Sequence, residues 1–270
     1  MKINHFLWGI IVSTLLLTSC TSPLEKRTNE AIMQVMNDFQ VVGISAAVVK
    51  DGQIVYNQSF GYKDLESKTP LANNHMMRIA SISKSFTATS LMQFVDRGIL
   101  SLDDDISDLI GFTIRNPHHP DTPITLRMVL SHTASFRDPE NYSTIDHLNP
   151  AISGDCSATY YDYQPGKGYN YSNLGLNLAG AILEKVSGVR FDNYVRDSII
   201  LRLGLNGGHN IDSLDNDLFA QIYRPREGEY KKSNAYSSVA HRMNDYVMGY
   251  SAPIFSPTGG VKISAHDLAQ

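Results

Sequence analysis

Two β-rich segments joined by Asp51-Gly52 constrain the fold of this chain more than any other feature of its sequence. They cover residues 44–49 and 53–62 and are rich in β-branched and aromatic side chains. The Asp-Gly pair tolerates the positive φ angles of a tight turn, so the sequence predicts a hairpin. A helical segment precedes the hairpin, and this order indicates the start of an α/β layer.

Apolar residues at helical spacing predict three longer helices. The first covers about residues 26–39, and its apolar positions should form one buried face. Those positions are Ile32, Val35, Met36 and Phe39. The second helix begins at Ser81 and ends near Gly98, and its apolar stripe consists of Ile82, Phe86, Leu91, Phe94 and Val95. The third runs from Leu174 to Val186, with Gly188 placed to end it.

The segment between the second and third helices is predicted to contain both short helices and loops. Residues 101–170 combine short helical pieces, such as 125–130, with loops rich in Pro, Asn and Asp. The middle of the chain is therefore a mostly helical lobe. Near the end, Ser264 resembles a helix N-cap with Asp267 in the first turn. That helix has barely begun at residue 270, so we expect either a further C-terminal segment or another element that completes it.

The N-terminus is typical of an export signal. Lys2 precedes a short apolar run over residues 6–17, shorter than the roughly 20 residues that span a bilayer. Leu17-Thr18-Ser19-Cys20 resembles the bacterial lipobox, in which cleavage before the cysteine is followed by its acylation. We therefore expect a lipoprotein signal peptide at 1–19, lipidation of Cys20, a tether at 20–26 and a membrane-anchored protein facing the periplasm or cell surface. The alternative is an ordinary secretory signal in which the position of Cys20 is fortuitous.

Charge and histidine spacing exclude some classes of function. Removal of residues 1–19 takes away Lys2, so the 23 basic residues become 22 against 27 acidic ones. That balance does not favour nucleic-acid binding. The nine histidines show no metal-ligand spacing, so we expect no metal.

Ser81-Ile82-Ser83-Lys84 is the first candidate for chemistry. Positions i and i+3 share one face of a helix, so the Lys84 amine can reach the Ser81 hydroxyl. A serine hydroxyl becomes a good nucleophile only when a base takes its proton, and lysine is such a base when burial and positive potential lower its pKa. Taken alone the motif is weak, because a helix cap followed by a surface lysine has the same pattern.

Tyr171-Ser172-Asn173 precedes the third helix directly. A phenol and a carboxamide can project from such a turn into a cleft, where Tyr171 could share a proton with Ser81 and Lys84 and Asn173 could hold a substrate amide. The alternative is structural, because Ser172 or Asn173 would also be a good helix N-cap. The two roles are compatible.

Several segments, in order, resemble the β-lactamase-related serine hydrolases, a family of class C β-lactamases, low-molecular-weight DD-peptidases, esterases and aminopeptidases. The matching segments are VGISAAVVKDGQIVYNQSFGYKDLESKTPL, MRIASISKSFTA, ILSLDDDISDLI, PITLRMVLSHTAS, YNYSNLGLNLAGAILEKVSG and SPTGGVKISAHDLA. This similarity covers the chain from about residue 27 onward. It implies an α+β fold, with an antiparallel sheet flanked by helices beside the mostly helical lobe, and a site between them.

The resemblance also implies the roles of the site residues. Ser81 would be the acylated serine, Lys84 its neighbouring base, Tyr171 the second proton carrier and Asn173 the substrate-binding amide. No metal or organic cofactor would be needed. We expect an acyl-enzyme formed with a β-lactam, a D-alanyl peptide or a small ester. The alternative is a catalytically impaired penicillin-binding-like lipoprotein that binds without turnover.

The sequence differs from the family pattern in two ways. Ala134 stands where the family has the first residue of a Ser-Gly pair, which could alter a tight turn, and neighbouring His132 resembles a scaffold residue rather than a base. The family's third motif, a Lys or His followed by Thr or Ser and Gly, is absent. Residues 257–260 imitate this motif without its cation, so we leave them unassigned. We therefore expect the domain at 27–270 to be incomplete, with its C-terminal strands missing.

Overall fold

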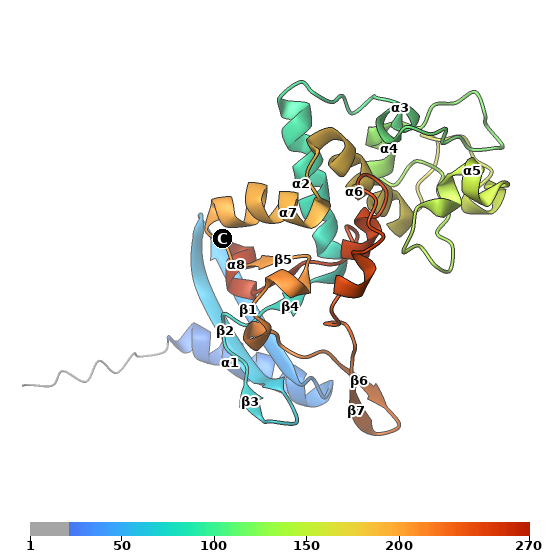
Figure 1. Cartoon of the computed structure of the whole chain (residues 1–270). Coiled ribbons are helices and arrows are strands. Elements are labelled where there is room, and N and C mark those ends of the chain that lie inside the picture. Colours follow the sequence, from blue (N-terminus) through green and yellow to red (C-terminus); the bar gives the residue numbers. More distant parts are fainter. Residues whose placement is uncertain (1–21) are drawn as a thin grey trace, which may run out of the picture. The chain divides into compact units, whose positions relative to one another are not determined.

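A computed structural model describes residues 22–270, so the expected signal peptide and Cys20 lie outside the described residues. The chain divides into two units, Met1–Val41 and Val42–Gln270. The helices and strands of the two units are labelled in chain order (Figure 1).

In the first unit, α1 (Pro23–Asp38) begins three residues before the predicted start. The Ser22 hydroxyl accepts a hydrogen bond from the Glu25 N–H at 3.1 Å, and Pro23 occupies the first turn, where proline is favoured. Part of the segment predicted as a tether is therefore helical. The predicted burial of its apolar face is wrong, because no residue of α1 is buried and Phe39 is 75% exposed.

The second unit begins with the predicted hairpin. Strands β1 (Gly43–Lys50) and β2 (Gln53–Asp64) pair antiparallel, and β3 (Thr69–Pro70) adds a third strand. Asp51 and Gly52 have φ angles of 52° and 73°, as a tight hairpin turn requires. The hairpin prediction is confirmed. Helix α8 (Ala265–Ala269) packs against β1, and the Ser264 hydroxyl caps it by accepting from the Asp267 N–H at 2.9 Å.

The rest of the second unit contains short strands and a helical lobe (Figure 1). The remaining strands are β4 (Met77–Arg78), β5 (Gly207–Gly208), β6 (Tyr223–Arg226), β7 (Glu229–Lys232) and β8 (Lys262–Ile263). The remaining α-helices are α2 (Ser83–Asp96), α3 (Ile106–Ile110), α4 (Leu126–Leu130), α5 (Pro150–Ser153), α6 (Asn173–Ser187) and α7 (Phe191–Val195). The result is a mixed fold in which small antiparallel sheets are flanked by helices beside a mostly helical lobe, as predicted.

Helix α6 is the centre of the lobe, with α2, α3, α4 and α7 packed around it. It is buried along most of its length, and its apolar residues join the main core. The Ser172 hydroxyl caps its start by accepting from the Gly175 N–H at 3.0 Å, and Gly188, at φ 66°, ends it. Both termini agree with the sequence prediction. In the predicted stripe of α2, however, Ile82 is 55% exposed, because it lies in the turn before the packed part of that helix.

The small sheet β4-β8-β5 brings the start of α2 beside the loop at residues 256–260. Met77 pairs with Ile263 and Arg78 with Lys262. Beyond the strands, the Ile79 N–H donates to the Val261 carbonyl at 3.0 Å, and the Val261 N–H donates to the Ser83 hydroxyl at 2.9 Å. These bonds fix that loop against the first turn of α2.

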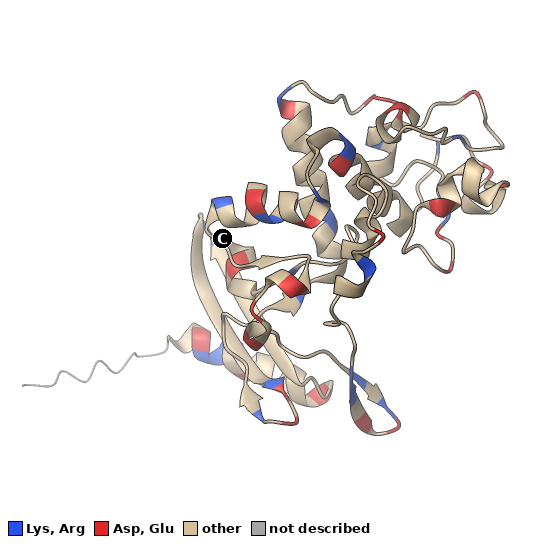
Figure 2. Ribbon diagram, viewed as in Figure 1, with Lys and Arg blue, Asp and Glu red and all other residues tan. Residues whose placement is uncertain are grey.

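Positions of Lys and Arg and positions of Asp and Glu are interspersed along the described part of the ribbon (Figure 2), and the formal net charge of the full sequence is -4. Within residues 22–270, no helix combines the length and apolar character needed to cross a membrane.

We predict that Gly180→Ala destabilises the fold, although alanine is the better helix former. A Cβ at this position would lie 2.3 Å from Cγ of Pro257, which is too close. Overpacking of this kind costs about 1–3 kcal/mol, more than the roughly 1 kcal/mol gained from helix propensity. Urea denaturation should show a lower free energy of unfolding. In Gly175→Ala, where the nearest atom is 3.3 Å away, the loss should be smaller. A Gly180→Ala protein more stable than the wild type would contradict the packing described.

Candidate active site

Ser81 lies at the junction between a strained turn and a long helix. It occupies the 3₁₀ turn Ala80–Ile82, which continues directly into α2. Ala80 has a φ of 47°, a left-handed conformation that costs a residue with a Cβ roughly 1 kcal/mol or more. Ser81 itself is exposed. The turn therefore presents its hydroxyl to solvent, one helical turn before Lys84.

Lys84 is the most constrained member of the site. Its side chain is only 9% exposed, and Nζ donates to three oxygens: the Ser81 hydroxyl at 3.2 Å, Asn173 Oδ1 at 2.9 Å and the Thr258 carbonyl at 2.9 Å. An ammonium group has three protons to donate, so these acceptors match the charged form of the side chain. Three separate segments therefore meet at one nitrogen.

Tyr171 contacts the same cation through its ring and its hydroxyl. The ring centroid lies 4.7 Å from Lys84 Nζ, within the range of a cation–π contact. Partial burial raises the pKa of the Tyr171 hydroxyl, but hydrogen bonds from Lys84 and Ser81, together with the Lys84 charge, outweigh this effect. The pKa of Tyr171 therefore lies below its ordinary value, which makes the phenolate more accessible.

Asn173 begins α6, and its side chain is held through its oxygen atom. Its Oδ1 accepts from Lys84 and also from the Thr258 hydroxyl at 2.8 Å. Its Nδ2 forms no hydrogen bond among residues 22–270 and is therefore available to an acceptor on a bound molecule. The structure thus brings together all four site residues predicted in the described region: Ser81, Lys84, Tyr171 and Asn173.

Thr258 is a member of the site that sequence reasoning left unassigned. It is 5% exposed, and it supplies one acceptor to Lys84 and one donor to Asn173. The preceding carbonyl, of Pro257, accepts from the Thr87 hydroxyl at 2.8 Å. The sequence feature that could have indicated Thr258 is the similarity of residues 257–260 to the family's third motif. Those residues lack the cation of that motif, so the sequence did not support an assignment.

Asp138 is a second residue that the sequence did not indicate. Its carboxylate accepts from the Ser172 hydroxyl at 2.8 Å and from the backbone N–H groups of Asn173 at 2.8 Å and Leu174 at 3.0 Å. A negative charge at a helix N-terminus is favourable, because the first N–H groups lack intrahelical acceptors. Asp138 therefore fixes the direction in which α6 presents Asn173. Its position in a loop without a motif provided no signal.

His132 supports Tyr171 rather than acting near Ser81. Its Nδ1 accepts from the Ser172 N–H at 3.2 Å, and its ring lies 4.6 Å from the Tyr171 ring. Burial and the Lys84 charge lower the pKa of His132, against the opposing effect of Asp138, so the imidazole is neutral. The geometry agrees with the predicted scaffold role. In the tight turn that Ala134 could alter, the positive φ angles belong to His132, at 60°, and Ser135, at 58°, and the Ser135 hydroxyl accepts from Asn116 Nδ2 at 2.9 Å.

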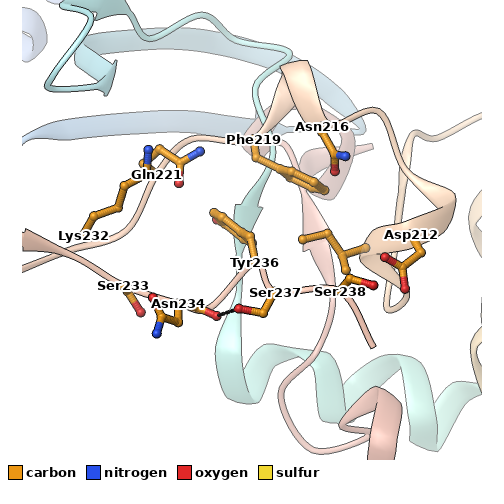
Figure 3. A pocket seen from close by; sticks show the side chains of 11 residues that line it. Asp212, Asn216, Phe219, Gln221, Lys232, Ser233, Asn234, Tyr236, Ser237 and Ser238 are labelled. Carbon is orange, nitrogen blue, oxygen red and sulfur yellow. Dashed lines mark hydrogen bonds between the residues drawn. The ribbon is translucent and has the colours of Figure 1, made fainter. Parts of the chain in front are cut away.

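A polar pocket of about 420 Å³ lies elsewhere in the second unit, beside the β6-β7 hairpin (Figure 3). It is lined by Ile211, Asp212, Asn216, Phe219, Gln221, Lys232, Ser233, Asn234, Tyr236, Ser237 and Ser238. Phe219 and Tyr236 stack at its wall with centroids 4.8 Å apart. Ser81 does not line this pocket. In the described part of the chain, no group of three or more His, Cys, Asp or Glu side chains could hold a metal ion.

An exposed serine one helical turn before a buried lysine, met by a Tyr-x-Asn turn from the helical lobe, is the arrangement that the resemblance to the β-lactamase-related serine hydrolases implies. The Beta-lactamase family profile matches residues 28–270, and the chain belongs to that family. Membership in this family supports a hydrolase.

Individual relatives agree with this assignment. Penicillin-binding protein 4* of Bacillus subtilis is 31% identical over an alignment of 170 residues that covers 57% of this chain and 35% of that protein. The octameric penicillin-binding protein homologue from Pyrococcus abyssi superposes with a TM-score of 0.72 at 26% identity, over 90% of this chain and 54% of that one. The D-alanine carboxypeptidase AmpC from Burkholderia cenocepacia shares the fold, with a TM-score of 0.69 at 20% identity over 91% of this chain and 62% of that one. The chain thus spans about a third of the curated relative's length.

We predict that Lys84→Met raises the pKa of Tyr171. The substitution removes both a hydrogen bond to the phenol and the nearby positive charge, and each of these lowers that pKa in the intact site. A pH titration by NMR, with ¹³C-labelled tyrosine, should show the Tyr171 transition at higher pH. Lys50→Met removes an exposed lysine of β1 and should leave the transition unchanged. An unshifted Tyr171 transition in Lys84→Met would contradict the electrostatic coupling.

Proposed function

We propose that this protein is a serine hydrolase that forms an acyl-enzyme on Ser81. The observation that carries the proposal is the convergence at Lys84 Nζ, which contacts the Ser81 hydroxyl, the Asn173 amide and the Tyr171 ring. A nucleophile within hydrogen-bond reach of a charged group, which in turn lies beside a titratable phenol, is the arrangement that nucleophilic catalysis needs. Its substrates are a β-lactam, a D-alanyl peptide or a small ester.

The proton of Ser81 passes to Tyr171 in this proposal. Lys84 Nζ donates to Ser81, Asn173 and Thr258 and also lies beside the Tyr171 hydroxyl, so in this proposal Lys84 is the positive charge that stabilises the Tyr171 phenolate, in place of the base role that the resemblance implies. As Ser81 Oγ attacks the carbonyl carbon, its proton moves to the phenolate, and a tetrahedral oxyanion forms. When the bond to the leaving group breaks, Tyr171 returns the proton to that group. Water then attacks the acyl-serine, with Tyr171 again accepting the proton. The bond between the acyl carbon and Ser81 Oγ breaks as Tyr171 returns that proton to Oγ, which releases the acid and restores the free serine and the phenolate.

Asn173 positions the substrate. Its Oδ1 is occupied by Lys84 and Thr258, so only the Nδ2 donor faces outward for a bound molecule. A donor suits a carbonyl oxygen on the acyl side of the substrate, such as that of an amide side chain or a peptide. The names of two relatives, a penicillin-binding protein and a D-alanine carboxypeptidase, support a β-lactam or a D-alanyl peptide over an ester.

We predict that Ser81→Ala abolishes covalent labelling by a fluorescent penicillin or a fluorophosphonate probe, because the acylated oxygen is gone. Intact-protein mass spectrometry should show the adduct on the wild type and none on the variant. Ser85→Ala is the matched control, since Ser85 is exposed on the same helix and its hydroxyl donates only to the Ile82 carbonyl. Lys84→Met and Tyr171→Phe should slow acylation by about 10²–10⁴-fold, as expected when a proton-transfer partner is lost.

Other results would overturn the proposal. Reversible binding of the penicillin without an adduct would favour the alternative, a penicillin-binding-like lipoprotein that binds and does not turn over. Labelling that persists in Ser81→Ala would place the nucleophile elsewhere. Normal acylation rates in both Lys84→Met and Tyr171→Phe would refute the proton pathway. Circular dichroism shows whether each variant is folded, so that a loss of labelling is read as a loss of chemistry.

The proposed location is a membrane facing the periplasm or the cell surface, with a lipid on Cys20 as the anchor. The support is the sequence alone: a basic residue, a short apolar run and the lipobox-like segment 17–20. We predict that the protein expressed with its own N-terminus in a bacterium partitions into the detergent phase of Triton X-114, and that Cys20→Ala moves it to the aqueous phase. Cys156→Ala, at the buried free thiol, should not change the partition. Equal partition of wild type and Cys20→Ala would contradict acylation.

A further inference from the structure

A small cavity of about 180 Å³ lies next to the loop 256–260. Thr258 of this loop contacts Lys84, whereas Ser256 and Gly260 line the cavity. Ile211 and Ser237 line both this cavity and the polar pocket of Figure 3, so the two spaces are neighbours. Ser81 is not among the residues around it. The cavity is therefore a feature separate from the proposed nucleophile.

His209 is a buried polar side chain without a partner in this cavity. It is 2% exposed, and neither ring nitrogen has a hydrogen-bond partner among residues 22–270. Its ring packs edge-on against Phe191 at a centroid distance of 4.7 Å. Burial, and then the Lys262 charge, lower the pKa of His209 to about 3, so the imidazole is neutral and has one N–H to donate. A buried donor left unpaired is costly, so its presence calls for an explanation.

Two cations line the same cavity. Lys262 is 7% exposed, and its Nζ donates to the His209 carbonyl at 2.5 Å. Arg78 Nε donates to the Gly259 carbonyl at 2.8 Å, while its terminal nitrogens form no hydrogen bond with the described residues. Arginine and lysine have donors only, so both favour an anion and repel a cation.

One carboxylate partly balances these charges. Asp212 acts electrostatically on Lys262, but its Oδ2 accepts from the Val239 N–H at 3.1 Å, and it lines the larger pocket rather than this cavity. With Arg78 and Lys262 on one side and Asp212 on the other, one positive charge is in excess. A ligand with a single negative charge would neutralise it.

Much of the remaining wall of the cavity is apolar. The apolar part consists of Ile211, Ala235, Val239, Ile254 and Phe255, and Ser237, Ser256 and Gly260 complete the lining. An inorganic anion would leave this wall without contacts, whereas a short hydrocarbon chain would cover it. A water molecule needs roughly 10–15 Å³ of such space, so the volume is ample for a ligand with a few carbon atoms.

We propose that this cavity binds a short aliphatic carboxylate, with the carboxylate accepting hydrogen bonds from Arg78, Lys262 and His209 and the chain lying on the apolar wall. The inference stands apart from the proposed hydrolase chemistry, because none of its residues is assigned to the acylation of Ser81. Charge-assisted hydrogen bonds in a partly buried site give both affinity and selectivity for the ionised ligand. The amide of the same acid lacks the charge and should not bind.

The test uses the full chain with Ser81→Ala, so that acylation plays no part, and butyrate as the probe. Isothermal titration calorimetry should show saturable binding of butyrate and none of butyramide at the same concentration. Lys262→Met and His209→Phe should each weaken butyrate binding by about tenfold or more, because each removes a donor to the carboxylate. Lys231→Met is the matched control, since it removes the same charge from an exposed position on β7 and should leave affinity unchanged.

Circular dichroism melting identifies any variant that fails to fold. Lys262 is buried, so Arg78→Gln, at an exposed side chain, provides the same test without changing the core. Three results would overturn the proposal: equal binding of butyramide, an equal loss of affinity in Lys231→Met, or chloride displacing butyrate as well as another short carboxylate does. Equal binding of butyramide would show that the negative charge of the ligand is not recognised. An equal loss in Lys231→Met would show that the effect is not specific to this cavity. Displacement by chloride would show that contacts with the apolar wall contribute nothing.

Discussion

The buried ammonium of Lys84 is the interaction on which the site depends. It lies almost out of contact with water and gives its three protons to oxygens from the turn before α2, the start of α6 and the loop 256–260. A buried charge is tolerated only when it is fully hydrogen-bonded, and the loss of one partner costs about 1–3 kcal/mol or more. The three segments are therefore held together by the same requirement that places Ser81, Tyr171 and Asn173 around one cation.

Helix α6 is the rigid part against which the other segments are positioned. Asp138 holds its first N–H groups, and at its other end the buried Glu184 accepts from the N–H groups of Phe191 and Gly249, both at 2.7 Å. In its middle, Gly180 leaves room for Pro257, next to Thr258. Burial raises the pKa of Glu184, and its hydrogen bonds oppose that effect. Two acidic residues that take no part in chemistry thus fix the helix that presents Asn173.

Membership in the Beta-lactamase family and the site geometry describe the same chemistry at different levels. The family defines the fold and supports a hydrolase, while the contacts of Lys84 are the basis for the proposed division between the group that holds charge and the group that moves a proton. His132 shows why the distinction matters. Its Nδ1 is an acceptor for the Ser172 N–H, so an imidazole that is attractive as a base in the sequence is occupied in supporting the Tyr171 turn.

The sequence by itself determined the hairpin at Asp51-Gly52, the helices after Ser81 and before Gly188, and the three candidate residues that meet Lys84, because these depend on local periodicity, turn chemistry and short motifs. Only the tertiary structure decided that Thr258 completes the contacts of Lys84 and that α1 leaves its apolar face unburied. The tertiary structure also decided that Ser135 takes a positive φ angle and that His209 lies beside Lys262. These features depend on which distant segments pack together, and contacts between residues far apart in the chain leave no periodic trace in either segment.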